Sequence, residues 1–366
     1  MSIQNNAKNI SVLPALTGLR GIAAAWVVLF HVFGSGVFFV GNGYAGVDVF
    51  FVLSGFILMH VYLKDDTLYS VQGYCRFLLL RLARVYPLHL FCLLVLLLLV
   101  CTVPGYRTVA AATAHHRDLF TYSGFIASLL LVQDWIPGLG DGWNTPSWSL
   151  SAEWLAYLFF PFIVFQIRKV PGRRLLIGYG MVLMAMLAGV LFFTGHPTSD
   201  AVGLSGILRM MMEFPAGCLM YLAFERNVVL PQRFVLGTCL GLLMASFVFP
   251  KIELVTLFAF PLLVLSAAQG RVRVLNLLCW TPIVFLGDIS FSIYLTHQIV
   301  IRLVGGVHGA GLDQRVLVNW GIIGAILLVS VVTHRCVEKP ARRFGRMLAQ
   351  QGIFLKRPRR LEPEES

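Results

Sequence analysis

The sequence predicts an all-α polytopic membrane protein with about ten transmembrane helices. Of its 366 residues, 58% are hydrophobic and only 13% are charged, and the mean hydropathy is +0.79. A soluble domain carries about 25% charged residues. Apolar runs long enough to cross a bilayer recur along the whole chain. These observations exclude a soluble enzyme and make the lipid bilayer the first expected partner.

The net charge of +12 and the seven cysteines fit the same class of protein. In a soluble chain this positive charge would suggest nucleic acid, whereas in a membrane protein it reflects Lys and Arg in cytoplasmic loops. The cysteines are scattered through the apolar runs, in an odd number and at no metal-ligand spacing. We therefore expect no nucleic-acid partner, no disulfide framework and no metal site.

The first half of the chain contains five predicted spans. The first 14 residues form a polar tail without the apolar core and cleavage site of a signal peptide. Each span then ends at residues that break a helix or carry charge, such as Gly34, Pro104 or Arg168. The five spans cover residues 16–33, 46–63, 88–103, 148–167 and 175–193. The apolar piece 124–132 is shorter than the roughly 17 residues that crossing requires, which predicts a re-entrant or interfacial helix.

The second half contains five further spans, of which the second and third are the shortest. They cover residues 206–224, 234–249, 254–268, 283–304 and 316–334. Charged or proline residues such as Glu225, Pro250 and Arg271 separate them. The segment Glu338, Lys339 and Pro340 is predicted to end the last helix, because proline removes a backbone donor.

Basic residues indicate how the chain crosses the membrane. If the N-terminus lies inside, the clusters on the cytoplasmic side are 76–84, 168–174, 271–273 and 335–360. The opposite loops keep only Arg107, Arg117, Lys251 and Arg315. This asymmetry predicts cytoplasmic N- and C-termini. We expect a cytoplasmic tail over residues 1–14, a single transmembrane domain over 15–345 and a basic cytoplasmic tail over 346–366.

The first two spans carry ionisable residues, namely Arg20, His31 and Asp48. Such groups are unfavourable in lipid and mark functional sites by default. Arg20 and His31 are eleven residues apart, which is about three helical turns, about 16 Å, and within about 20° of the same face. This shared stripe should therefore face protein or a water-filled cavity rather than lipid.

Positions within the spans divide the polar residues into two levels. Near the outer ends lie His31, Asp48, Glu153, Arg209, Tyr294 and His297. Near the inner face lie Arg20, Arg81 and Arg84, and the i, i+3 spacing of the last two puts both guanidinium groups on one helix face. Arginine forks suit phosphate. A ligand that is polyanionic at one end and reactive at the other, on an arm of roughly 15–20 Å, would fit this arrangement, and acyl-coenzyme A (acyl-CoA) is such a ligand.

Six segments in order resemble the acyltransferase-3 family of bacterial membrane O-acyltransferases. They are LTGLRGIAAAWVVLFHV, GYAGVDVFFVLSGFIL, RLARVYPLHL, NTPSWSLSAEWLAYLFFP, FLGDISFSIYLTHQ and VEKP, and the resemblance runs from residue 16 to about residue 345. Such proteins acylate cell-surface glycans, including the O-antigen of lipopolysaccharide and exopolysaccharide, from the inner membrane. The chain resembles the stand-alone form, without an added esterase-like domain.

The resemblance assigns residues to roles. The family's Arg-ten residues-His pattern corresponds to Arg20 and His31, its Arg-x-x-Arg to Arg81 and Arg84, its acidic position in the second span to Asp48 and its Ser-Leu-Ser-x-Glu to residues 149–153. It implies that cytoplasmic acyl-CoA, most simply acetyl-CoA, binds the arginines. His31 would then act as general base on a sugar hydroxyl or carry the acyl group transiently.

Several assignments stay open at this level. Either Asp48 or Glu153 could support the imidazole of His31, and Trp148, Ser149, Arg209, Tyr294 and His297 are candidates for binding a glycan or lipid-linked oligosaccharide acceptor. Each of these residues also has a purely structural alternative. The arginines could anchor the helices on the cytoplasmic side or at lipid headgroups, and the aromatic residues could form a belt at the membrane interface. The carboxylates could form ion pairs with Arg209. The competing class of protein is a proton-coupled transporter or flippase, which would need no acyl-CoA.

Overall fold

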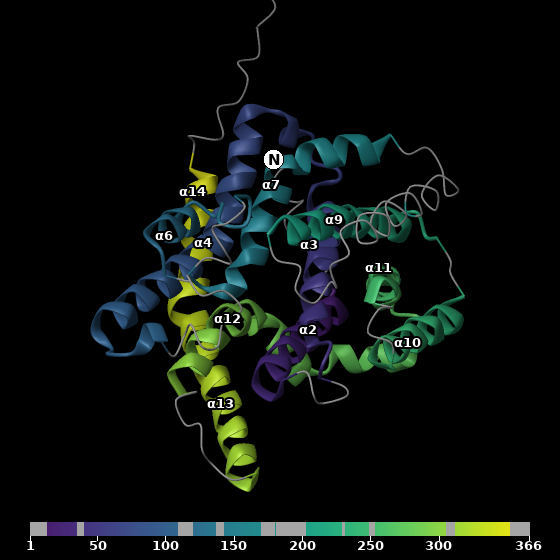
Figure 1. Ribbon diagram of the computed structural model, residues 1–366. Coiled ribbons are helices and arrows are strands. Elements are labelled where there is room, and N and C mark those ends of the chain that lie inside the picture. The colour runs from purple at the N-terminus through teal and green to yellow at the C-terminus, as the bar shows by residue number, and fades with distance from the viewer. Residues whose placement is uncertain are drawn as a thin grey trace, which may run out of the picture.

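The computed structural model describes residues 13–34, 40–108, 120–136, 143–169, 180, 203–228, 231–248, 253–304 and 312–351. In these ranges all regular structure is helical and no strand occurs (Figure 1). Seven helices are long and apolar enough to cross a membrane, or eight if a bent pair, Ala259–Gln269 with Arg273–Cys279, counts as one span. The prediction of an all-α polytopic membrane protein is therefore confirmed. The count of ten stays a prediction, since the span predicted over 175–193 lies outside the described residues apart from Gly180.

The other predicted spans coincide with helices. They are α2 (Pro14–Phe33), α3 (Gly46–Tyr62), α4 (Val71–Thr102), α7 (Trp148–Arg168), α9 (Leu204–Glu225), α10 (Gln232–Val248), α11 (Glu253–Gln269), α12 (Thr281–Val304) and α13 (Leu312–Thr333). Helices α10 and α11 have 17 residues each, which is the lower limit for crossing a bilayer. Helix α6 (Tyr122–Leu129) has eight residues and is too short to cross, as predicted for the piece 124–132.

Helix α4 differs from its prediction. The third span was expected to begin at Leu88, with the arginines in a preceding segment, but α4 runs without a break from Val71 through Pro87 to Thr102. Proline removes only one backbone hydrogen bond, and membrane helices tolerate it where neighbouring groups satisfy the freed carbonyl. Arg81 and Arg84 therefore lie on the same rigid helix as the third span.

The expected end of the last helix is wrong. A π-helical turn, η7 (His334–Glu338), follows α13 and leads directly into α14 (Lys339–Gln350). Pro340 lies in the first turn of α14, where its missing N–H has no consequence. The continuous stretch Val316–Gln350 has 35 residues, or about 52 Å at 1.5 Å per residue. Because the hydrocarbon core is about 30 Å thick, one end of this stretch extends beyond it.

Glycines set the two closest helix contacts. A Cβ on Gly287 of α12 would lie 1.9 Å from the carbonyl oxygen of Thr17 on α2, and one on Gly217 of α9 would lie 2.0 Å from that of Val52 on α3. Gly55 of α3 approaches the backbone of α9 in the same way. Gly55 and Gly287 therefore serve helix packing. They fix α2 against α12 and α3 against α9.

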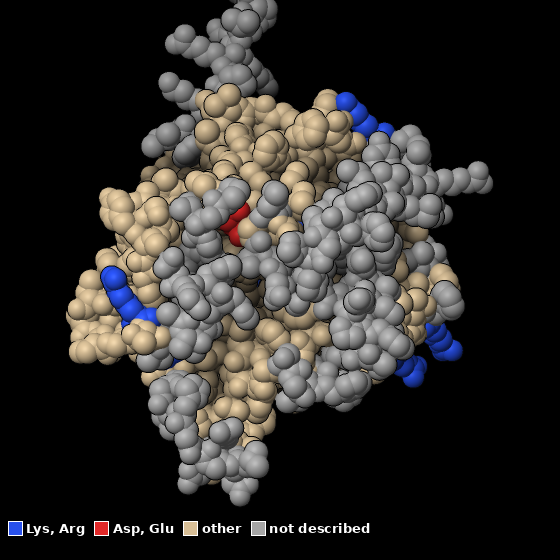
Figure 2. All heavy atoms as spheres, viewed as in Figure 1, with Lys and Arg blue, Asp and Glu red and all other residues tan. Residues whose placement is uncertain are grey.

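The outer surface matches a lipid environment. On the face shown in Figure 2, the described atoms are almost all uncharged, and Lys and Arg side chains lie at its margins. Exposed apolar side chains include Leu98, Phe162 and Leu328, each at least 60% exposed. Buried polar and charged residues instead gather between the helices, where they can be paired.

Candidate functional site

A cavity of about 270 Å³ lies between α2, α3, α4, α7 and α12. Its lining on α3 extends from Val47 to Val61, a rise of about 21 Å. Its wall includes the three predicted inner arginines, Arg20, Arg81 and Arg84. It also includes Ser54, Ser149, Glu153 and Tyr294. The cavity therefore joins the predicted inner arginines to some of the predicted outer residues.

The arginines come together from helices α2 and α4. The Nε and Nη2 groups of Arg20 donate hydrogen bonds of 3.1 and 2.7 Å to the carbonyl oxygen of Gly287 on α12. The guanidinium carbon of Arg81 lies 5.9 Å from the ring centre of Tyr62 and 5.8 Å from that of Phe77. These backbone and aromatic contacts orient Arg20 and Arg81, and guanidinium groups held in this way suit an anion site.

Glu153 is the predicted carboxylate that lies on the cavity wall. It accepts hydrogen bonds from the hydroxyl of Ser54 on α3 and, at 2.5 Å, from that of Tyr157 one turn along α7. Nearby, the hydroxyl groups of Ser149 and Tyr294 are hydrogen-bonded at 2.8 Å. These contacts hold α7 against α3 and α12 at the cavity.

Asp48 has a different environment. It forms an ion pair with Arg209 of α9, in which each residue is 2% exposed, and Glu213, also 2% exposed, lies close enough to interact with both. None of the three residues lines the cavity described above. An ion pair between Arg209 and a carboxylate was one of the alternatives considered from the sequence. The structure contains this pair with Asp48, and it joins α3 to α9.

His31 lies beyond the cavity, at the far end of α2, and pairs with His297 of α12. The ring centroids are 5.0 Å apart. The Nδ1 of His31 is 2.9 Å from the carbonyl oxygen of Val27, and that of His297 is 2.6 Å from the carbonyl oxygen of Tyr294. If each Nδ1 donates, each neutral ring keeps Nε2 as its basic nitrogen. The Nε2 of His297 is buried and has no hydrogen-bond partner among the described residues.

Tyr294 connects the cavity to the histidine pair. Its hydroxyl contacts Ser149 on the cavity wall, and its ring centroid lies 5.9 Å from that of His297. The polar groups therefore form a row from the arginines through the cavity to His31. Trp148 lies outside this row: it packs edge-on against Phe51 at 6.0 Å and does not line the cavity.

Sequence reasoning missed two charged positions beside the site. Arg302 of α12 is 2% exposed, donates to the hydroxyl of Thr145 at 2.7 Å and lies close enough to His297 to interact with it electrostatically. An arginine inside the predicted span 283–304 satisfies the criterion that selected Arg20, so it could have been found. Glu338 was taken for the end of a helix but is 3% exposed and contacts His334 and Arg342. No group of three or more His, Cys, Asp or Glu side chains among the described residues is arranged to hold a metal ion.

The sequence model of a family described as an acyltransferase domain matches residues 13–335. The chain belongs to the acyltransferase-3 family. It is 30% identical to the acyltransferase MdmB of Streptomyces mycarofaciens, over 90% of this chain and 92% of that protein. It is 26% identical to the putative membrane-bound transacylase BcsY of Komagataeibacter xylinus, over 88% of this chain and 81% of that protein.

The chain also resembles a longer protein. It is 23% identical to the O-acetyltransferase OatA of Staphylococcus aureus over 91% of its own length, and it spans 58% of the length of that protein. No solved structure matches the chain. Together with the spanning helices, membership of the acyltransferase-3 family makes the protein a multi-pass membrane acyltransferase.

Proposed function

We propose that the protein transfers an acyl group, most simply acetyl, from cytoplasmic acyl-CoA to a sugar hydroxyl of a cell-surface or exported glycan. The observation that carries this proposal is the cavity, which has three arginines and a half-buried carboxylate on one continuous wall. The names of the relatives OatA and BcsY support an O-acyl product and a membrane location for the reaction. The acceptor would be an exopolysaccharide, an O-antigen or a lipid-linked oligosaccharide.

The donor would bind with its phosphates on Arg20, Arg81 and Arg84. Guanidinium groups bind phosphate oxygens in pairs through parallel N–H donors. The acyl arm would then extend along the cavity, whose wall on α3 rises about 21 Å from Val61 to Val47. The arm of acyl-CoA, roughly 15–20 Å, fits this length and would bring the thioester toward Tyr294 and His31.

The chemical step would use His31. As a general base, its neutral imidazole removes the proton from the acceptor hydroxyl while the oxygen attacks the thioester carbonyl carbon. The new C–O bond forms as the C–S bond breaks, and the imidazolium returns the proton to the departing CoA thiolate. As an acyl carrier, His31 itself would attack the thioester carbonyl carbon and release CoA as the C–S bond breaks. The sugar oxygen would then displace the imidazole, which takes up the proton of the hydroxyl. Both routes use the same residues, with Glu153 the carboxylate on the cavity side.

The membrane sides follow from the same arrangement. The basic clusters predict that both termini, the arginine end of the cavity and the acyl-CoA pool share the cytoplasmic side. His31 then lies near the outer end of α2, close to where an exported glycan would be presented. In a bacterium the protein would then lie in the inner membrane, with residues 15–345 as one catalytic domain.

The direct test is acyl transfer in membranes from expressing cells. Acetyl-CoA labelled in the acetyl group is added, and alkali-labile label is measured in the glycan fraction of the native host. Wild type is compared at equal protein level with His31→Ala and with a control on the same helix, Ile22→Ala, whose side chain is 43% exposed. We expect label from wild type and from Ile22→Ala only.

The other outcomes are equally informative. Equal label from wild type and His31→Ala would exclude His31 from the chemistry but not acyl transfer. No label from wild type with any acyl-CoA would contradict the donor assignment, and uptake or export of glycan without acyl-CoA would then favour a transporter.

A further inference from the structure

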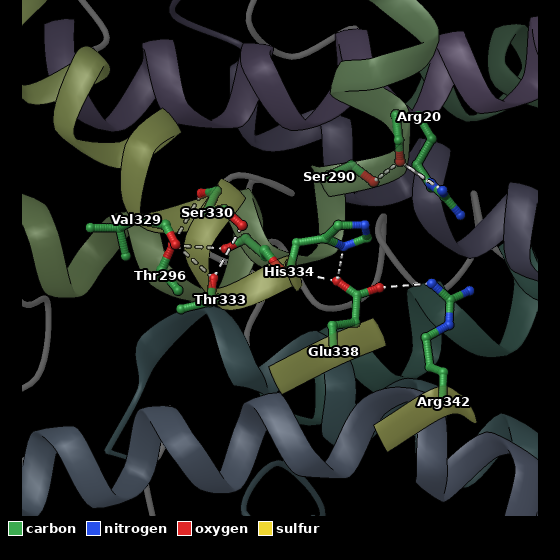
Figure 3. Close-up of polar contacts among 11 residues, drawn as sticks. Arg20, Ser290, Thr296, Val329, Ser330, Thr333, His334, Glu338 and Arg342 are labelled. Atoms are coloured by element: carbon green, nitrogen blue, oxygen red, sulfur yellow. Dashed lines mark hydrogen bonds and ion pairs between the residues drawn. The ribbon is translucent and has the colours of Figure 1, made fainter. Parts of the chain in front are cut away.

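A buried carboxylate occupies the π-helical turn between α13 and α14. Glu338 is 3% exposed, and its Oε2 accepts a hydrogen bond of 3.0 Å from Ser292 of α12 and lies 2.8 Å from Nδ1 of His334. Its Oε1 accepts a hydrogen bond of 2.9 Å from Nη1 of Arg342 (Figure 3). Glu338 therefore fixes the position of Arg342 relative to α12.

Arg342 points toward the arginines of the cavity. Its charge interacts with those of Arg84, Arg81 and Arg346, and also with that of Arg20. Figure 3 shows Arg20 and Arg342 to the right of Glu338, with Arg20 above and Arg342 below. The side chain of Arg342 is 34% exposed, so solvent reaches part of it. The side chains of Arg20, Arg84 and Arg342 therefore gather near Glu338, whose negative charge interacts with those of Arg20 and Arg342.

The backbone keeps α14 close to this place. A Cβ on Gly345 would lie 2.1 Å from the Cβ of Ala83, which sits between Arg81 and Arg84 on α4. Gly345 therefore allows the two helices to touch at the level of those arginines. Any larger residue there would push Arg342 and Arg346 away from α4.

We propose that α14 completes the phosphate site for the donor, with Arg342 binding phosphate directly and Glu338 positioning it. This inference rests on the proposed function, since the ligand is the phosphate-bearing end of acyl-CoA. Clustered like charges repel one another, and a bound polyanion would relieve this repulsion. A purely structural Glu338–Arg342 pair would hold α14 in place but would not discriminate between ligands with and without phosphate.

Direct binding of CoA separates these possibilities. The full chain is reconstituted in phosphatidylcholine nanodiscs, and Kd is measured for CoA and for pantetheine, which shares the arm but has no phosphate. The variants are Arg342→Gln, Arg342→Lys and Glu338→Gln. The matched control is Arg343→Gln, since Arg343 is the next residue on α14 and is exposed.

We expect Arg342→Gln to weaken CoA binding about tenfold, as for loss of a charge-assisted hydrogen bond, and to leave the Kd for pantetheine unchanged. Arg342→Lys should recover part of the loss because it keeps the charge, and Glu338→Gln should weaken CoA binding less than Arg342→Gln. Arg343→Gln should behave like wild type.

Three outcomes would overturn the inference. If CoA binds wild type and Arg342→Gln equally, α14 has no part in the phosphate site although the donor assignment stands. Equal weakening for CoA and pantetheine would show a structural role. An effect of Arg342→Gln that appears only in nanodiscs containing phosphatidylglycerol, and not in phosphatidylcholine alone, would assign Arg342 to lipid headgroups. Failure of wild type to bind CoA at all would instead contradict the proposed donor itself.

Discussion

The rings of His31 and His297 lie 5.0 Å apart, centroid to centroid, on two helices that glycines bring into backbone contact. Because each Nδ1 faces a carbonyl oxygen of its own helix, the rotation of both rings is restricted. A base held in one orientation loses less entropy when it reaches the transition state. The pair therefore differs from an isolated histidine at a membrane interface.

The first prediction concerns this pair. His31→Ala should lower turnover about 10²- to 10⁴-fold, the usual contribution of a general base, while the Kd for CoA stays within about twofold of the wild-type value. His297→Phe, which keeps ring volume and removes both nitrogens, should lower turnover less. Single-turnover transfer and CoA binding on the same preparations measure both effects. Unchanged turnover in His31→Ala would contradict the assignment.

The second prediction concerns Asp48 and Arg209. Arg209→Gln leaves Asp48 and Glu213 buried without their cation and should destabilise the protein by about 3–5 kcal/mol. Asp48→Asn should cost less, because Glu213 remains beside Arg209. The double variant Asp48→Asn/Arg209→Gln should recover part of the stability lost in Arg209→Gln. Thermal unfolding in detergent measures the stability of each variant.

The activity of the double variant then distinguishes a structural role of Asp48 from a chemical one. If Asp48 serves only the α3–α9 contact, the double variant should transfer acyl groups at a rate that follows its folded fraction. A double variant that is stable but inactive would instead show that Asp48 takes part in catalysis, as the sequence resemblance implied.

The spans could be predicted because each depends on a local property, the length of an apolar run. Every predicted span within the described residues coincides with a helix. The errors lie at prolines. The third span was predicted to begin after Pro87 and the last helix to end at Pro340, yet Pro87 lies inside α4 and Pro340 opens α14. What decides these cases is whether neighbouring helices satisfy the freed backbone groups, and that is a tertiary property.

Partners across helices could not be read from spacing. Arg209 and Asp48 are 161 residues apart in sequence, and Ser54 and Glu153 are 99 residues apart. Periodicity places each side chain on a face of its own helix but does not say which helix meets that face. Arg20 with His31 and Arg81 with Arg84 could be grouped because each pair lies on one helix.

The third prediction tests Glu153. Glu153→Gln keeps the size of the side chain and can still accept from Ser54 and Tyr157, so stability should change by less than about 1 kcal/mol. Loss of the negative charge on the cavity wall should lower turnover at least about tenfold. Ser54→Ala serves as the control, since it removes one hydrogen bond but leaves the charge. If Glu153→Gln and Ser54→Ala have equal effects, the carboxylate acts only as a hydrogen-bond acceptor.

The fourth prediction concerns the glycine contact that holds α3 against α9. In Gly217→Ala the new methyl group would lie 2.0 Å from the carbonyl oxygen of Val52, so the two backbones must separate. Such overpacking typically costs about 1–3 kcal/mol, and here it would also lengthen the Asp48–Arg209 contact between the same helices. Gly237→Ala on α10 is the control, because nothing lies within 4 Å of a Cβ there and alanine favours a helix by about 1 kcal/mol. The melting temperature should fall for Gly217→Ala and stay equal or rise for Gly237→Ala.

Equal melting temperatures for wild type and Gly217→Ala would contradict this prediction. They would mean that α3 and α9 can move apart freely, and that this contact does not set the geometry of the buried ion pair.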